Sequence, residues 1–311
     1  MAGPGNCRAA PWPPLPYEAW KDTQATLHLW TQIVGKIRLA QAPWTNHSWH
    51  VPLYVTARGL TTSPVPYGAR TFEIAFDFLA HQLLIQTSDG AVETLPLAPR
   101  TVADFHRELF ARLRSLGLDV RIRTVPCELP EAIPFEMDEE HRSYDADAVG
   151  RFRQALVQAD RVLKQFRARF IGKASPVHFF WGSFDLAVTR CSGRRAPPHP
   201  GGVPNLPDWV AREAYSHEVS SCGFWPGGEA MPRAVFYAYA YPEPDGFKAA
   251  SVRPVQARYE GGLGEFVLPY DEVRQAASPD DMLLQFLQTT YEAAADLGRW
   301  DRAALESAGT P

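Results

Sequence analysis

Two stretches of the chain concentrate the side chains that could do chemistry. Residues 175–195 read SPVHFFWGSFDLAVTRCSGRR, and residues 213–228 read EAYSHEVSSCGFWPGG. Imidazole and carboxyl groups are the usual general acids and bases, so both stretches supply candidates for catalysis. These candidates are His178, Asp185, His217 and Glu218. Neighbours on a strand point to opposite faces, so each would need a partner from another strand.

Alternation along a strand divides residues 178–191 into two faces. The first face is mostly apolar and consists of His178, Phe180, Gly182, Phe184, Leu186, Val188 and Arg190. The second mixes aromatic rings with hydroxyl, carboxyl and thiol groups and consists of Phe179, Trp181, Ser183, Asp185, Ala187, Thr189 and Cys191. That mixture is typical of a pocket wall, because a solvated face would carry Lys and Glu. The alternative is that Asp185 only satisfies a neighbouring buried donor.

Residues 192–212 are rich in Pro and Gly and read as a long loop that could cover the pocket as a lid. Arginines at its start offer a rigid donor fork for a carboxylate or phosphate. Surface ion pairs are the alternative role for such arginines. The expected ligand-binding residues are Phe179, Trp181, Ser183, Arg190, Arg194, Trp209 and Trp225.

Known cofactor motifs are missing from the sequence. It contains no Walker or dinucleotide-binding glycine loop, no GxSxG elbow and no HExxH helix. The four cysteines include no CxxC pair, which argues against a zinc knuckle or a disulfide framework. A metal site from His47, His178, His217 and Glu218 requires the two halves of the chain to meet. Cofactor and metal content therefore stay open.

Four segments show the apolar periodicity of helices: 17–34, 102–116, 146–170 and 279–297. Thr101, Asp145 and Ser278 are placed to cap the last three. Strand-like runs occupy 49–57, 71–78, 82–87, 119–125, 177–191, 215–222, 234–241 and 264–268. Strands follow strands with few helical crossovers. The pattern therefore predicts an α+β fold with mainly antiparallel sheets packed against long amphipathic helices.

A weak internal repeat suggests two related modules. The order helix, GK, Pro, His, Trp, LxVT, strands and helix occurs twice, although with different spacings, so coincidence is the alternative. The expected organisation is a disordered lead, an N-terminal α+β module, a connector, a C-terminal α+β module and a tail. Their bounds are 1–16, 17–127, 128–144, 145–300 and 301–311.

Composition narrows the class of protein. The 311 residues are 45% hydrophobic and 21% charged, which is globular composition with ample material for a core. A net charge of −4 gives no basic field for nucleic acid or anionic membrane, and no apolar run is long enough to span a bilayer. We expect a cytoplasmic protein with a small-molecule ligand.

The blocks SPVHFFWGSFDLAVTRCSGRRAP, SHEVSSCGFWPGG and NHSWHVPLYVTARGL resemble the signature blocks of an uncharacterised bacterial protein family, a domain of unknown function. The resemblance covers roughly residues 17–300. It implies a single intact family unit and a bacterial source, and it carries over no catalytic residue.

Three functions follow from these residues. The first is an aromatic-walled polar pocket that binds a small, anionic ligand. The second is a hydrolase- or isomerase-like enzyme that uses His, Asp or Glu in the same pocket, with or without a metal. The third is a non-catalytic protein-interaction module. A perturbed pKa at the pocket base indicates the enzyme, carboxylates neutralised by arginines indicate the binding protein, and a large flat apolar patch indicates the interaction module.

Overall fold

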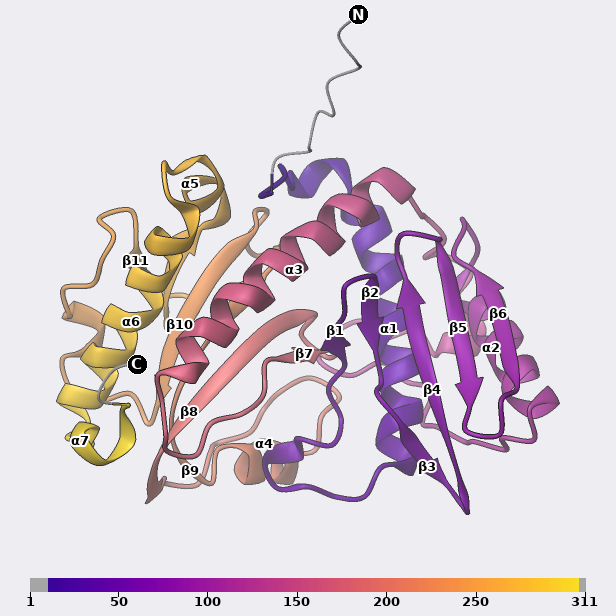
Figure 1. The fold of residues 1–311 in the computed structure, drawn as a ribbon, viewed down its shortest axis with the longest axis horizontal. Coiled ribbons are helices and arrows are strands. Elements are labelled where there is room, and N and C mark those ends of the chain that lie inside the picture. Colours follow the sequence, from indigo (N-terminus) through magenta and orange to yellow (C-terminus); the bar gives the residue numbers. More distant parts are fainter. Residues whose placement is uncertain (1–10, 308–311) are drawn as a thin grey trace, which may run out of the picture.

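The computed structural model describes residues 11–307, which form two antiparallel six-stranded sheets and seven α-helices within that range (Figure 1). This confirms the predicted α+β class. The helices are α1 (Lys21–Gln41), α2 (Val102–Ser115), α3 (Ala146–Ala168), α4 (Asp208–Ala214), α5 (Tyr270–Gln275), α6 (Pro279–Leu297) and α7 (Arg302–Leu305). None of these helices combines the length and apolar character that crossing a membrane requires.

The first sheet has the order β1-β2-β4-β5-β6, with β3 also paired to β4. Its strands are β1 (Tyr54–Val55), β2 (Gly59–Thr61), β3 (Val65–Tyr67), β4 (Arg70–Asp77), β5 (Gln82–Thr87) and β6 (Val92–Pro96). The second sheet has the order β11-β12-β10-β9-β8-β7. Its strands are β7 (His178–Phe180), β8 (Asp185–Arg195), β9 (His217–Trp225), β10 (Val235–Tyr241), β11 (Arg258–Glu260) and β12 (Glu265–Pro269). The two orders differ, and the duplication stays a prediction.

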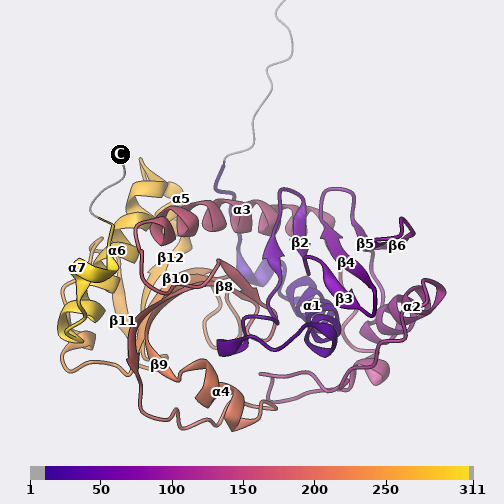
Figure 2. The same ribbon diagram turned by 60° about the horizontal axis from the view of Figure 1, so that its bottom comes forward.

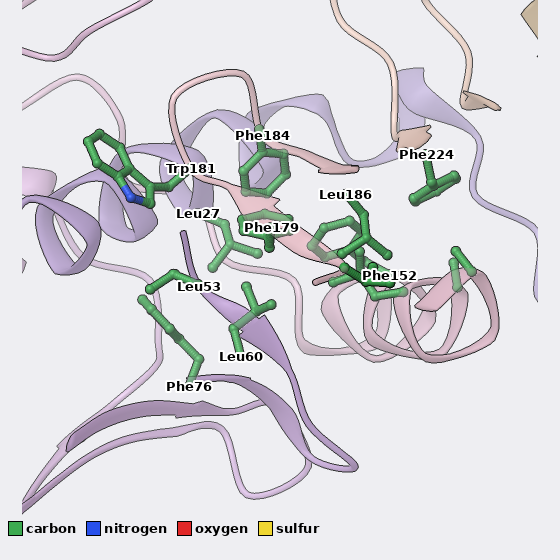
Figure 3. Packing of buried hydrophobic residues seen from close by; sticks show 14 of the residues in the cluster. Leu27, Leu53, Leu60, Phe76, Phe152, Phe179, Trp181, Phe184, Leu186 and Phe224 are labelled. Carbon is green, nitrogen blue, oxygen red and sulfur yellow. The ribbon is translucent and has the colours of Figure 1, made fainter. Parts of the chain in front are cut away.

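A backbone bridge joins the edges of the two sheets. Leu53 and Phe179 exchange two N–H···O=C bonds of 2.9 Å each. Around this bridge, apolar side chains from α1, α3 and both sheets form one continuous core, shown in part in Figure 3. Phe152 of α3 stacks on Phe184, with ring centroids 5.2 Å apart. The N-terminal and C-terminal sheets therefore share their hydrophobic packing.

Helix starts follow the predicted capping chemistry in two of three cases. The Thr101 hydroxyl accepts from the Asp104 amide, and the Asp145 carboxylate accepts from the Asp147 and Ala148 amides. Ser278 precedes α6, but its hydroxyl donates to the Asp281 carboxylate and accepts no backbone amide. A nearby acidic residue in the first turn thus displaces the expected cap bond.

Two sequence expectations for segments outside the site differ from the structure. Residues 119–125 form no strand, because they cross the surface and pair with no neighbour in either sheet. Within the lead expected at 1–16, residues 1–10 lie outside the described residues, whereas Trp12 and Leu15 are buried. The Tyr270 hydroxyl donates to the Pro13 carbonyl at 2.8 Å, which fixes this segment against α5.

Candidate functional site

The segment expected as one long strand is a hairpin. β7 and β8 are joined by a turn at residues 181–184, where Phe184 adopts a left-handed φ of 60°. The turn reverses the chain, so His178 is opposite Ala187 and Phe179 is opposite Leu186. The predicted faces therefore hold for 185–191 but are exchanged for 178–180, and Phe179 lies in the apolar core.

The two faces of the second sheet have different partners. Leu186 and Val188 lie on the face covered by α3, while Asp185 and Thr189 lie on the other. In Figure 2, α3 and α4 lie on opposite sides of this sheet. Cross-strand register places Ser221 beside Thr189 and Tyr239 beside Ser221, so the second face is rich in hydroxyl groups.

A cavity of about 530 Å³ lies over this second face. Its aromatic walls are Trp44, Trp49, Phe180, Trp181 and Trp209. Trp44 and Trp209 come from the loop after α1 and from α4, and their ring centroids are 5.5 Å apart. Both are more than half exposed, at 51% and 55%, which places large apolar rings in contact with solvent. Such a concave, mainly apolar cavity with aromatic walls and a few polar groups is the usual form of a small-molecule site.

Asp185 lies on the cavity floor and is buried. Its carboxylate accepts hydrogen bonds from Ser183 Oγ at 2.5 Å and from the Tyr237 hydroxyl. Burial raises the pKa of Asp185, and these two donors oppose that rise. Within residues 11–307 no arginine or lysine forms an ion pair with it, so this buried carboxylate is stabilised by two hydroxyl donors and its own backbone amide and not by a cation.

Glu128 brings a second carboxyl group into the cavity from the segment before α3. Its backbone is left-handed, with φ at 62°, and its amide donates to the Pro204 carbonyl at 2.8 Å. Burial, and then the Asp185 charge, raises the pKa of Glu128 to about 7. In the described part of the chain its carboxyl oxygens have no hydrogen-bonding or ion-pairing partner. A strained non-glycine residue that carries an unpaired carboxyl group is characteristic of a functional site.

Hydroxyl groups and a third carboxyl surround this pair. The Tyr215 and Tyr239 hydroxyls are 2.8 Å apart, and the Thr189 and Ser221 hydroxyls are 2.9 Å apart. Glu265 begins β12, and its pKa is raised to about 7 by burial and then by the Asp185 charge. The cavity floor thus combines two acids of raised pKa, Glu128 and Asp185, with hydroxyl groups that both donate and accept, while Glu265 lies outside the cavity lining.

Four of the residues expected from the sequence line the cavity, namely Trp181, Ser183, Asp185 and Trp209. The Arg190 side chain lies on the opposite face, with its guanidinium carbon 3.5 Å from the Phe166 ring centroid. Arg194 Nε donates to Glu218 at 2.8 Å, and Arg194 also bonds the carbonyls at the end of α6. Trp225 packs in a separate small cluster with Met231, Val235 and Val267. None of these four side chains (Arg190, Arg194, Glu218, Trp225) is part of the cavity wall.

The candidate histidines do not gather at one site, because His178 lies apart from the neighbouring pair His47 and His217. His178 is buried against Trp49 and Tyr54, both of its ring nitrogens lack a partner in residues 11–307, and burial lowers its pKa to about 3. His217 lies 5.6 Å from the His47 ring, centroid to centroid, and its pKa is lowered by burial. Over residues 11–307 no three His, Cys, Asp or Glu side chains come together as metal ligands would.

Sequence reasoning missed Glu128 and the tyrosines of β10. Glu128 lies in the segment assigned as a connector, and no periodicity marks it. The tyrosines did leave a signal, because VFYAYAY places Tyr237, Tyr239 and Tyr241 at every second position of one strand. Tyrosines at every second position of a buried strand place their hydroxyl groups on one face, which predicts a row of hydroxyl groups there.

Fold and site together define an α+β protein with an aromatic-walled pocket on one face of an antiparallel sheet. The chain matches the model of the family of unknown function DUF5996 over residues 12–307, and it belongs to that family. The resemblance predicted from the sequence blocks is thereby confirmed at the level of the family. No curated protein and no solved structure matches the chain.

Proposed function

We propose that this protein is an enzyme that performs general acid–base chemistry on a small polar molecule bound in the cavity. The observation that carries the proposal is the pairing of two carboxyl groups, Glu128 and Asp185, that share the cavity floor with raised pKa and no neutralising cation in the described chain. Carboxylates that only bind or stabilise are usually ion-paired when buried. Among the functions considered from the sequence, the enzyme is the one that predicts carboxyl groups of perturbed pKa at the base of the pocket.

The two groups have complementary roles. With a pKa of about 7, Glu128 is close to half-protonated at neutral pH and can give or take a proton. Asp185 is held by Ser183 and Tyr237, so its position is fixed while Glu128 stays available to the ligand. Because the charges interact, the pair titrates as a unit. Such a pair supports hydrolysis or isomerisation, in which one group donates a proton and the other removes one.

The ligand proposed from the sequence carries an anionic group, and the structure changes which residues would bind it. Arg190 and Arg194 have partners elsewhere, whereas Arg121 and Arg123 line the cavity and are exposed, and Arg121 forms a long, solvent-exposed ion pair with Asp119 at 4.0 Å. We therefore propose that a carboxylate or phosphate of the ligand lies toward Arg121 and Arg123, and that the reacting part lies toward the carboxyl pair.

The experiment is a comparison of substrate conversion by four proteins. A mixture of small-molecule metabolites is incubated with the wild type, Glu128→Gln, Asp185→Asn and the control Glu218→Gln, and is followed by mass spectrometry. We expect the wild type and the control to convert the same compound, and the first two variants to lose roughly 10²-fold or more of the rate. A compound that shifts the melting temperature of the wild type and is never converted would show a binding protein instead.

A further inference from the structure

Three polar side chains follow one face of α1, a helix that is mostly buried between residues 23 and 37. His28, Gln32 and Lys36 are spaced four residues apart, so they lie one above the other on the helix surface. We call this set the α1 polar stripe. Gln32 and Lys36 are buried at 0% and 7% exposure, and a buried polar group is retained only where it has partners.

Each side chain of the α1 polar stripe forms a hydrogen bond to backbone near one of the two cavity carboxyl groups. Gln32 and Lys36 bond the segment before Glu128, and His28 bonds the turn before Asp185. Gln32 clamps Cys127 from both sides: its Nε2 donates to the Cys127 carbonyl, and its Oε1 accepts from the Cys127 amide, both at 2.9 Å. Lys36 Nζ donates to the Val125 carbonyl at 2.9 Å. Two turns of the helix thus hold the residues immediately before Glu128.

The same stripe reaches the β7–β8 turn. His28 Nε2 lies 2.9 Å from the Gly182 carbonyl, next to Ser183, and 3.2 Å from Gln32 Nε2. Burial lowers the pKa of His28 to about 4, so the ring is neutral at physiological pH. Trp181 of the same turn lies against α1 so closely that a Cβ on Gly35 would come within 2.2 Å of its indole nitrogen.

We infer that the α1 polar stripe positions the carboxyl pair, with Gln32 as the positioning residue for Glu128. One helix fixes both the Glu128 segment and the turn before Asp185, and these come from distant parts of the chain. Gln32 touches neither carboxyl group and acts through the Cys127 backbone. The clamp also holds the residue directly before Glu128, whose backbone is left-handed, a conformation that non-glycine residues adopt at a cost. This inference rests on the proposed function.

The test is the pKa of the Glu128 carboxyl group, measured by carbon-13 NMR titration in Gln32→Met. This variant keeps the length and apolar volume of the side chain but removes both clamp bonds. We expect the Glu128 pKa to fall by about one unit or more, because a released segment becomes hydrated and moves away from Asp185. The matched control is Gln24→Met, since Gln24 is also a buried glutamine of α1 but donates to Gly227. It should leave the Glu128 pKa unchanged.

Lys36→Met is a second variant in case Gln32→Met does not fold. Loss of the Lys36 charge alone would raise the pKa of a nearby carboxyl, whereas release of the segment lowers it, so a fall identifies positioning. An unchanged or raised Glu128 pKa in the folded variants overturns the inference. An ordinary Glu128 pKa in the wild type would instead overturn the proposed function, so the two failures are distinguishable.

Discussion

The phenol of Tyr237 crosses over Gly223 to donate a hydrogen bond to Asp185. The two residues lie on β10 and β8, and β9 between them contributes a glycine where a Cβ would come within 2.5 Å of the Tyr237 hydroxyl. Asp185 has no cation to balance it in the described chain, so this hydrogen bond from a neutral phenol stabilises a buried carboxylate.

Tyr237→Phe should destabilise the protein more at neutral pH than in acid. Loss of a donor to a buried carboxylate costs about 1.5–3 kcal/mol, and the cost shrinks once Asp185 is protonated. Denaturant unfolding at neutral pH and at about pH 4 measures this difference. Tyr215→Phe removes a bond between two neutral hydroxyls and serves as the control, with a cost that does not change between these pH values. Equal costs for Tyr237→Phe at both pH values would contradict an ionised Asp185.

The contribution of Glu128 and Glu265 to the free energy of unfolding should fall as pH rises from about 4.5 to about 7. The buried His28 and His178, whose pKa values are lowered, act in the opposite direction over part of this range, so single variants are needed to separate the contributions. Glu128 and Glu265 each have a folded pKa of about 7 against an ordinary 4.5. A raised acid pKa means that the folded state binds the proton more tightly, so its stability is complete below the unfolded pKa and is lost through the folded one. Each carboxyl contributes up to about 3 kcal/mol.

Glu265→Gln isolates one part of this pH dependence. We expect it to stabilise the protein above about pH 7 and to remove the Glu265 part of the fall in stability between about pH 4.5 and pH 7, because a neutral amide carries no burial penalty for charge. Denaturation series at several pH values, beside the exposed control Glu139→Gln, measure the slope. A slope identical to that of the wild type would show that Glu265 titrates normally.

Gly182→Ala should displace Glu128 at little cost in stability. The added Cβ would come within 2.0 Å of Glu128 Oε1, the far end of a flexible side chain that can move away. We expect the Glu128 pKa to fall toward its ordinary value while the free energy of unfolding changes by less than about 1 kcal/mol. Gly261→Ala, where nothing lies within 4 Å, is the control. If the Glu128 pKa in Gly182→Ala equals that of the wild type, the Glu128 carboxyl group does not lie against Gly182.

Arg190 and Arg194 should differ sharply in their contribution to stability. Arg190 is buried among the Phe166, Phe170 and Tyr291 rings and donates to the Phe166 carbonyl near the end of α3. Arg190→Ala should cost about 3–5 kcal/mol, as other large buried truncations do. Arg194→Ala breaks a partly exposed pair with Glu218 and should cost about 1 kcal/mol or less. Thermal unfolding of both variants gives the comparison, and similar costs would refute this assignment.

Local patterns predicted the elements well but predicted the site only in part. The apolar stripes of α2, α3 and α6 follow from 3.6-residue periodicity, and the strand alternation placed Asp185 and Thr189 on the polar face. The hairpin turn was missed because Gly182 and Ser183 interrupt the apolar run only briefly, although a Gly–Ser pair is a turn signal.

Long-range partners account for the remaining differences. From its place in a strand, Arg190 is predicted to bind a ligand. In the structure its guanidinium packs against the Phe166, Phe170 and Tyr291 rings. These rings are distant in sequence, so no local pattern predicts the contact. Glu128 joins Asp185 through tertiary packing across a connector. Sequence spacing cannot reveal such a pair, because its geometry depends on how distant segments are held together.

The α1 polar stripe also has a consequence for synthesis on the ribosome. Lys36, Gln32 and His28 bond partners that lie 89, 95 and 154 residues further along the chain. When α1 and the strands of the first sheet emerge, those partners have not yet been made, and the stripe is satisfied only by water. The carboxyl pair is therefore assembled after the first sheet, once the β7–β8 turn has been translated, and a truncated nascent chain cannot carry out the reaction proposed for the full protein.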